Sequence, residues 1–329
     1  MKDADVRPNP PPPGTSEATL QVMEEGTLLP PLRTVDLDGP IRYREWPGPP
    51  GPTFVCVHGL GGTHLNWMAV AQGLSRHGRV LAFDLAGFGH TPRAGRSSGL
   101  PANRRLLSSY ISELAEPPVI GVGNSMGGAI VALQAALEPT SLAGAILTSP
   151  ALPWTREVRP ERLIVAAFTF YRVPGLAEVL VRNRALRWGP ERIVREALKV
   201  CCVDPSRIEP AVLQAQVEMT AFRERDRDAV PAFLQAARSL MHLKGRPTFV
   251  QRVMNGVRCP VLLIHGERDR LVPVDLAREV VRNRRNWRLE VIPDVGHIGH
   301  MEAPGRWLDA AAEWLADIGM RSPALARQS

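Results

Sequence analysis

The sequence has 329 residues, of which 44% are hydrophobic, and its formal net charge is +7. These values fit a soluble globular protein with room for one large α/β domain and an insertion. No run of 18 apolar residues occurs, which argues against a transmembrane helix, and residues 1–7 lack the apolar core of a secretory signal.

The first segment of the chain is rich in proline, and residues 8–13 contain five prolines. Such a tract is too stiff and too polar to pack, so we expect residues 1–25 to be a disordered arm. Four cysteines, two of them adjacent, do not form a disulfide framework. They indicate buried thiols in a reducing compartment, and we therefore expect a cytoplasmic protein.

Alternating strand and helix patterns follow the arm. A hairpin is predicted first, with strands at 33–37 and 41–46 flanking Asp38-Gly39. Further strands are predicted at 53–57, 79–83, 118–122, 142–148, 260–265 and 287–292, and helices at 65–77, 102–115, 126–137, 273–284 and 304–318. This rhythm predicts an α/β fold, with a doubly wound, mostly parallel eight-stranded sheet and helices on both faces.

Between residues 150 and 258 the rhythm stops. The segment has no convincing strand but several amphipathic helical patterns that are interrupted by prolines. We therefore expect an all-helical cap, or lid, at 151–258, inserted into a core domain made of residues 26–150 and 259–329.

The most informative short motif is Gly123-Asn124-Ser125-Met126-Gly127, which joins an apolar strand to a helical stretch. The glycines permit a sharp bend that exposes the serine hydroxyl and aims the first helical amides at whatever the serine attacks. Ser125 is thus the nucleophile candidate.

A serine nucleophile needs a base and a carboxylate that orients the base. Asp269 follows the strand at 260–265, and His297 lies in the loop after the strand at 287–292. Asp294 and His300 are the alternatives for acid and base. We favour Asp269, since a separate loop lets it approach the imidazole end-on, and we expect a structural role for His300 at a helix start.

Together these motifs resemble the α/β-hydrolase superfamily of serine hydrolases, with a cap inserted after the sixth strand. The resemblance covers residues 35–150 and 259–318 and rests on motifs at 58–62, 84–91, 123–128, 265–269 and 296–304. It implies that Asp269 is the acid, that His297 is the base, and that the backbone amides of Leu60 and Met126 form an oxyanion hole.

The oxyanion loop also has a reading that does not depend on the family. His58-Gly59-Leu60-Gly61-Gly62 follows a strand, and its glycines let backbone amides approach a ligand closely. We expect His58 to order this loop through hydrogen bonds. Asp84, at the end of the strand 79–83, is expected to hold the glycine turn that follows it.

The cap carries the basic charge of the chain, with 19 Lys and Arg against 11 Asp and Glu in residues 151–258. Arginines that keep exposed helix faces soluble are one explanation of this balance, and attraction of the cap to anionic lipid surfaces or to acidic substrates is the functional alternative. Basic residues alternate with acids and lack an aromatic-studded patch, so no nucleic-acid binding is expected. The oligomeric state is left open.

The cap also supplies more apolar side chains than a thin lid needs. We expect Phe168, Tyr171, Phe222 and Phe233 to line an acyl-sized pocket, which makes an apolar carboxylic ester the expected substrate. The expected reaction is acyl transfer through Ser125. No metal or nucleotide cofactor is expected, because metal-ligand spacing and a phosphate-loop ending are both missing from the sequence.

Two alternatives remain from the sequence. One is a carbon-carbon bond hydrolase of vinylogous diketones, whose serine turn resembles residues 123–128, although those relatives carry Trp where this chain has Ile298. The other is a ligand receptor that kept the fold without turnover. Epoxide hydrolases and haloalkane dehalogenases are disfavoured, because they carry Asp at the position of Ser125.

Overall fold

One eight-stranded sheet forms the centre of the molecule in the computed structural model, which describes residues 29–153, 158, 165–166, 169–282 and 284–320. The strands are β1 Arg33–Asp36, β2 Pro40–Trp46, β3 Thr53–Val57, β4 Arg79–Phe83, β5 Val119–Asn124, β6 Gly144–Thr148, β7 Val261–Gly266 and β8 Trp287–Ile292. Their order is β1-β2-β4-β3-β5-β6-β7-β8. Strand β2 pairs antiparallel with β1 and β4, and the remaining pairings are parallel. The predicted fold class is confirmed, while the predicted proline-rich arm at 1–25 lies outside the described residues.

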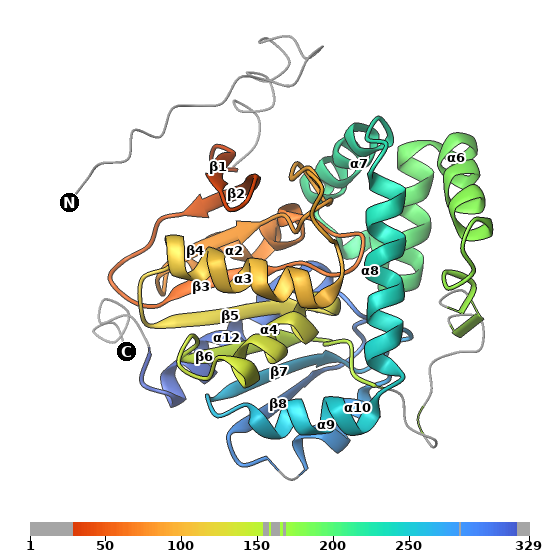
Figure 1. Ribbon diagram of the computed structural model, residues 1–329. Helices are drawn as coiled ribbons and strands as arrows, with labels where there is room; N and C mark the ends of the chain where they lie inside the picture. The colour runs from red at the N-terminus through yellow and green to blue at the C-terminus, as the bar shows by residue number, and fades with distance from the viewer. Residues whose placement is uncertain (1–28, 154–157, 159–164, 167–168, 283, 321–329) are drawn as a thin grey trace.

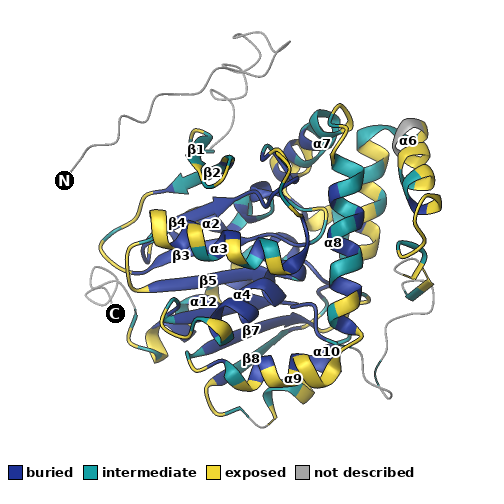
Figure 2. Ribbon diagram, viewed as in Figure 1, coloured by how far each residue is buried: buried dark blue, intermediate teal, exposed yellow. Residues whose placement is uncertain are grey.

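Helices cover both faces of the sheet, as the alternation of side chains along a strand requires. In β3, Val55 and Val57 pack with one apolar layer, and Phe54 and Cys56 pack with the other. The first layer includes side chains of α3 Leu100–Leu114, α4 Met126–Leu137, α9 Pro247–Gly256 and α10 Val274–Val281. The second includes α2 Met68–Leu74 and α12 Pro304–Asp317. The central strands β3, β5, β6 and β7 are buried between these layers (Figure 2).

The predicted core helices are present with small shifts at their ends. The expected helix at 65–77 is a 3-10 turn, η1 His64–Trp67, followed by α2. Thr63 begins this turn, since its hydroxyl accepts a hydrogen bond from the backbone of Leu65. The helix α4 begins directly after Ser125 and has the bounds expected from the sequence, 126–137.

Helices occupy the described residues between β6 and β7. They are α6 Leu176–Cys201, the 3-10 turn η2 Pro205–Arg207, α7 Pro210–Glu224, α8 Ala229–Lys244 and α9. Figure 1 shows α6, α7 and α8 standing beside one end of the sheet. A break at Gly189 and Pro190 divides α6 into two helical pieces. Helix α9 packs against α4, so the predicted cap boundary at residue 258 stays a prediction.

Polar contacts fasten these helices to the core. On α8, Gln235 accepts hydrogen bonds from the Ser98 backbone at 2.8 Å and from Arg93 at 3.1 Å. The Ser239 hydroxyl accepts one from the backbone of Leu100, where α3 begins, at 3.0 Å. From α7, Arg223 donates to the carbonyl of Gly87 at 2.6 Å. The loops after β4 therefore fix the position of α7 and α8.

Candidate active site

Ser125 occupies a strained turn between β5 and α4. Its backbone has φ 53° and ψ −114°, a region that residues with a side chain rarely occupy and that is found at functional sites. The turn needs glycine on both sides. A Cβ at Gly127 would lie 2.0 Å from the Val57 carbonyl oxygen, and one at Gly123 would lie 2.6 Å from the Gly127 backbone. The sequence therefore forces Ser125 to stand out from the strand end.

Asp269 and His297 form a buried hydrogen-bonded pair. The Nδ1 atom of His297 lies 2.8 Å from Oδ2 of Asp269, and a carboxylate oxygen accepts, so Nδ1 carries the proton. The other carboxylate oxygen accepts from the backbone N–H groups of Leu271 and Val272, both at 2.9 Å. Burial by itself would raise the pKa of Asp269, but His297 and His265 lower it well below its usual range. Asp269 is therefore a carboxylate that holds the imidazole in one tautomer.

His265, at the end of β7, is a third member of this group. Its Nε2 lies 2.7 Å from the carbonyl oxygen of Val272 and 3.3 Å from Oδ2 of Asp269, and the carbonyl requires that Nε2 be the donor. This contact holds the turn that carries Asp269. No role was predicted for His265 from the sequence. Its position directly before the Gly-Glu-Arg-Asp turn is the signal by which it could have been found.

Asn124 connects the serine turn to the loop of His297. Its side-chain amide donates to the carbonyl of His297 at 3.2 Å and to that of Thr148 at 3.1 Å. Ser125 and His297 therefore lie on neighbouring loops, and the buried side chain of Asn124 joins these loops. Asn124 belongs to the motif at 123–127, but the motif alone does not predict this role for its side chain.

The loop after β3 lies against the serine. A Cβ built at Gly59 would lie 3.3 Å from Cβ of Ser125, so glycine lets the two backbones approach closely. His58 is fully buried, donates from Nδ1 to the Gly59 carbonyl at 2.8 Å, and accepts from the Leu85 backbone at 3.1 Å. Burial lowers the pKa of His58 to about 4, so the ring is neutral and orders the loop, as the sequence predicts.

The two residues predicted to form an oxyanion hole flank this serine. Leu60 follows Gly59, and Met126 is the first residue of α4. The backbone N–H of a first helical residue has no acceptor within its own helix and points out of the N-terminus. The position of Met126 is thus compatible with an anion-binding amide, and the role of both amides stays a prediction.

Asp84 has the structural role expected from the sequence. One of its carboxylate oxygens accepts from the His90 backbone at 2.8 Å, which closes the glycine turn, and the other accepts from the His64 backbone at 2.7 Å. Burial alone would raise the pKa of Asp84, but the facing rings of His64, His58 and His90 lower it well below its usual range.

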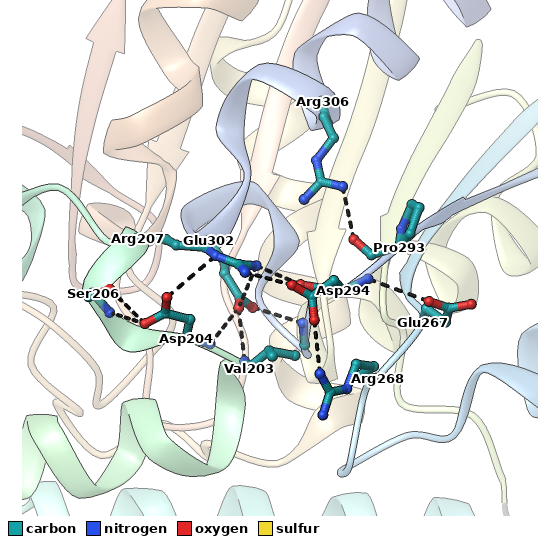
Figure 3. Close-up of polar contacts among 11 residues, drawn as sticks. Val203, Asp204, Ser206, Arg207, Glu267, Arg268, Pro293, Asp294, Glu302 and Arg306 are labelled. Atoms are coloured by element: carbon teal, nitrogen blue, oxygen red, sulfur yellow. Dashed lines mark hydrogen bonds and ion pairs between the residues drawn. The ribbon is translucent and has the colours of Figure 1, made fainter.

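Glu302 is a buried carboxylate that accepts hydrogen bonds from three backbone N–H groups (Figure 3). Its Oε2 accepts from the Gly296 backbone at 2.8 Å, and its Oε1 accepts from the backbones of Val203 at 2.8 Å and Asp204 at 2.9 Å. The loop between α6 and α7 is therefore joined to the loop of His297 by one carboxylate. Nothing in the sequence pattern indicates this role for Glu302, because two of its three partners, Val203 and Asp204, lie almost 100 residues away along the chain.

Asp294, the alternative acid, takes part in an exposed cluster of charges that Arg207 links to Glu302 (Figure 3). Its carboxylate accepts from Arg207 at 2.6 Å and from Arg268 at 2.9 Å, and these arginines lower its pKa. His297 contacts Asp269 instead. The geometry therefore brings together the pair that the sequence favoured.

His300, the alternative base, is fully buried against Trp67, with ring centroids 4.6 Å apart. Neither of its ring nitrogens has a hydrogen-bond partner among the described residues. Burial lowers the pKa of His300 to about 3, so the ring is neutral and packs as part of the core. This arrangement leaves His300 without the carboxylate that a catalytic base needs.

The cap side chains predicted to contact substrate lie in two places. Phe233 of α8 would lie 3.4 Å from a Cβ built at Gly61, and its ring meets that of Tyr171 edge-on at 5.4 Å. Phe222 of α7 lies beside His90, at 4.6 Å between ring centroids. Phe168 lies outside the described residues. Phe233 and Tyr171 therefore stand next to the loop of Leu60.

Among the described residues, no group of three or more His, Cys, Asp or Glu side chains is arranged to hold a metal ion. The same part of the chain contains no helix whose length and apolar character would let it cross a bilayer.

Comparison with known proteins places this arrangement in a family. The family profile described as alpha/beta hydrolase fold matches residues 52–304, so the chain belongs to the α/β-hydrolase family. It is 26% identical over 270 residues to the 2-hydroxy-6-oxo-6-(2'-aminophenyl)hexa-2,4-dienoic acid hydrolase of Metapseudomonas resinovorans, covering 81% of this chain and 84% of that protein. It is 27% identical over 237 residues to the pimeloyl-[acyl-carrier protein] methyl ester esterase of Vibrio cholerae, covering 70% of this chain and 81% of that protein.

The structure of the haloalkane dehalogenase DatA from Agrobacterium tumefaciens C58 superposes with a TM-score of 0.73 at 20% identity, covering 87% of this chain and 97% of that protein. This likeness shows the fold. Relatives of the chain thus include an esterase and a dienoic acid hydrolase, and the resemblance inferred from the sequence motifs is confirmed at the level of the family.

Proposed function

We propose that the protein hydrolyses carboxylic esters with an apolar acyl or alcohol part, with Ser125, His297 and Asp269 as a catalytic triad. One observation carries the proposal: the 2.8 Å hydrogen bond between His297 Nδ1 and Asp269 Oδ2, in the loop that Asn124 joins to the strained Ser125 turn. A neutral imidazole whose Nδ1–H is held in this way presents its Nε2 lone pair to accept a proton.

The reaction follows from these positions. Ser125 Oγ attacks the ester carbonyl carbon while His297 takes the hydroxyl proton, and the carbonyl oxygen becomes an oxyanion that the N–H groups of Leu60 and Met126 stabilise. His297 then protonates the leaving alcohol as the carbon-oxygen bond breaks. Water attacks the acyl-enzyme, again with His297 as base, and releases the carboxylic acid and the Ser125 hydroxyl.

The cap supports an apolar substrate part. Phe233 and Tyr171 stand beside the loop of Leu60, where an acyl or alcohol chain leaving the reacting carbon would pass. Aromatic side chains at this place favour a hydrocarbon over a charged group. The Vibrio relative is named for an ester with a methyl alcohol part, which agrees with ester chemistry on this fold.

A second candidate is cleavage of a carbon-carbon bond in a vinylogous diketone. The Metapseudomonas relative, named for such a compound, favours it, as does the sequence of residues 123–128. Ile298 after the base is the departure that argues for the ester.

The test uses purified protein, a fluorophosphonate probe and two substrate sets. Labelling of Ser125 with hydrolysis of p-nitrophenyl esters, both abolished in Ser125→Ala, supports the proposal. Cleavage of a vinylogous diketone with negligible ester hydrolysis selects the second candidate. Ligand-induced thermal shifts without labelling or turnover would indicate a receptor, and full ester hydrolysis by Ser125→Ala would overturn the triad.

A further inference from the structure

The first half of α6 presents an exposed apolar surface. We call it the outer face of α6 and define it as Val173, Leu176, Val179 and Leu180, whose side chains are 44%, 51%, 55% and 48% exposed. They make up half of the large hydrophobic side chains that are exposed in the described part of the chain. Leu176, Val179 and Leu180 follow the i, i+3, i+4 repeat and lie on one side of α6, and Val173 lies in the turn directly before the helix. Figures 1 and 2 show this helix at the outer edge of the molecule.

Arginines surround the outer face of α6. Arg172, Arg182 and Arg187 are exposed, and Arg184 lies over the Trp188 ring at 5.1 Å. The acidic residue of residues 172–188 is Glu178, and its charge is balanced by Arg238 on α8 at 2.8 Å. The surface around the apolar side chains is therefore positive. This charge favours an anionic partner and disfavours a basic one.

We propose that the outer face of α6 docks on an anionic phospholipid bilayer. An interfacial helix combines apolar side chains, which enter the region between headgroups and acyl chains, with arginines that meet the lipid phosphates. Trp188 has the amphipathic ring favoured at that depth. Four adjacent half-exposed aliphatic side chains within a positive rim match this combination, and charge complementarity selects an anionic surface over a neutral one.

The outer face of α6 is joined to the candidate active site. Arg238 donates to the carbonyl of Tyr171 at 2.9 Å, and the ring of Tyr171 meets that of Phe233 beside the loop of Leu60. Only Arg172 separates Tyr171 from Val173 along the chain. Docking would therefore place the apolar side chains of the site near the bilayer, from which, if the proposed function holds, an apolar ester could enter. The docking itself does not depend on that function.

Vesicle sedimentation with the full chain tests the proposal. We expect the protein to bind phosphatidylcholine vesicles that contain phosphatidylglycerol, to bind pure phosphatidylcholine weakly, and to lose binding as salt increases. Arg182→Gln and Arg187→Gln should each lower the partition coefficient about fivefold. Leu176→Gln with Leu180→Gln should lower it roughly tenfold or more, and glutamine keeps the helix.

Arg105→Gln and Leu137→Gln are the matched controls, since Arg105 is exposed on α3 and Leu137 is 58% exposed at the end of α4. They should leave vesicle binding unchanged. Near-ultraviolet circular dichroism checks that each variant is folded. The proposal is overturned by absent binding, by equal binding to both vesicle types, or by loss of binding in the controls alone. Self-association that Leu176→Gln and Leu180→Gln abolish would overturn it too, because a second copy would then cover the face.

Discussion

Oε2 of Glu302 accepts a 2.8 Å hydrogen bond from the backbone N–H of Gly296, the residue directly before His297. The same carboxylate accepts two backbone N–H bonds from the loop between α6 and α7. Three donors converge on one buried side chain, so the position of His297 depends on the Glu302 carboxylate and on the loop between α6 and α7.

Glu302→Gln should impair both catalysis and folding. The amide keeps one acceptor oxygen but turns an NH2 group toward backbone donors, which leaves buried N–H groups unpaired. We expect kcat for a short ester to fall about tenfold and the free energy of unfolding to fall by about 1–3 kcal/mol. Glu267→Gln, at an exposed residue of the neighbouring loop, is the control and should change neither. Unaltered kcat and stability in Glu302→Gln would show that Glu302 does not hold the loop of His297 in place.

Asp269→Asn and Asp294→Asn together decide which carboxylate serves the base. Asparagine at 269 can hold His297 in the wrong tautomer, so kcat should fall by about 10³–10⁴. Asp294 contacts Arg207 and Arg268 instead, and its loss should change kcat less than about threefold, since exposed ion pairs contribute little. Steady-state hydrolysis of one p-nitrophenyl ester measures both variants, and the reverse ranking would assign the acid to Asp294.

His300 should make the protein sensitive to acid. Its pKa in the folded state is about 3, below the ordinary value of about 6.5, so the unfolded chain binds a proton that the folded chain does not. Its contribution to stability is complete above about pH 6.5 and is lost as the pH falls toward the folded pKa, at about 1.4 kcal/mol per pH unit. Urea unfolding over a pH series measures this slope.

His300→Phe keeps the contact with Trp67 and removes the titrating group. The slope of the unfolding free energy against pH should decrease by about 1.4 kcal/mol per pH unit between about pH 4 and about pH 6.5, because one proton fewer is taken up on unfolding. His58 and His90, whose pKa values burial lowers to about 4, continue to contribute the remaining slope. His242→Gln, at an exposed position, should leave the slope as it is. An unchanged slope in His300→Phe would show that the ring takes up its proton without unfolding.

Phe233→Ala should change the preference for chain length. Removing the ring takes apolar surface from beside the loop of Leu60, so kcat/KM for esters with long acyl chains should fall roughly tenfold, while acetyl esters change little. Phe249→Ala, on α9 and 41% exposed, is the matched control. An ester panel from short to long chains gives the ratio, and equal losses at all lengths would place Phe233 outside the substrate path.

The sequence predicted the sheet and the order of the site loops well, because both depend on local patterns. The start of α4 depends on Gly127, which lies close to the Val57 carbonyl. The pairing of Asp269 with His297 follows from the parallel pairing of β7 and β8, which brings the loops after both strands to the same edge of the sheet. The roles of Asn124 and Glu302 could not be predicted. Their partners are backbone groups of distant segments, and no periodicity in a single sequence records which segments meet.

The cap shows the same limit. Its helical patterns were evident, but its attachment through Gln235 and Ser239 depends on where α8 meets the start of α3. The excess of arginine in residues 151–258 indicated a basic surface. The grouping of four exposed aliphatic side chains at the start of α6 could not be predicted, because the sequence does not show that the helix packs on the side of Ala177.

The backbone N–H of His297 donates to the carbonyl of Cys201, the last residue of α6, at 2.6 Å. If a linker replaced the inserted helices, the backbone N–H of His297 would lose its acceptor at Cys201. Glu302 would lose two of its three donors, the backbone N–H groups of Val203 and Asp204. Excision would not leave a minimal hydrolase with a wider entrance. Exchange of the insertion between relatives would have to retain the junction at residues 201–204, and evolutionary variation of this segment is accordingly expected to spare that junction.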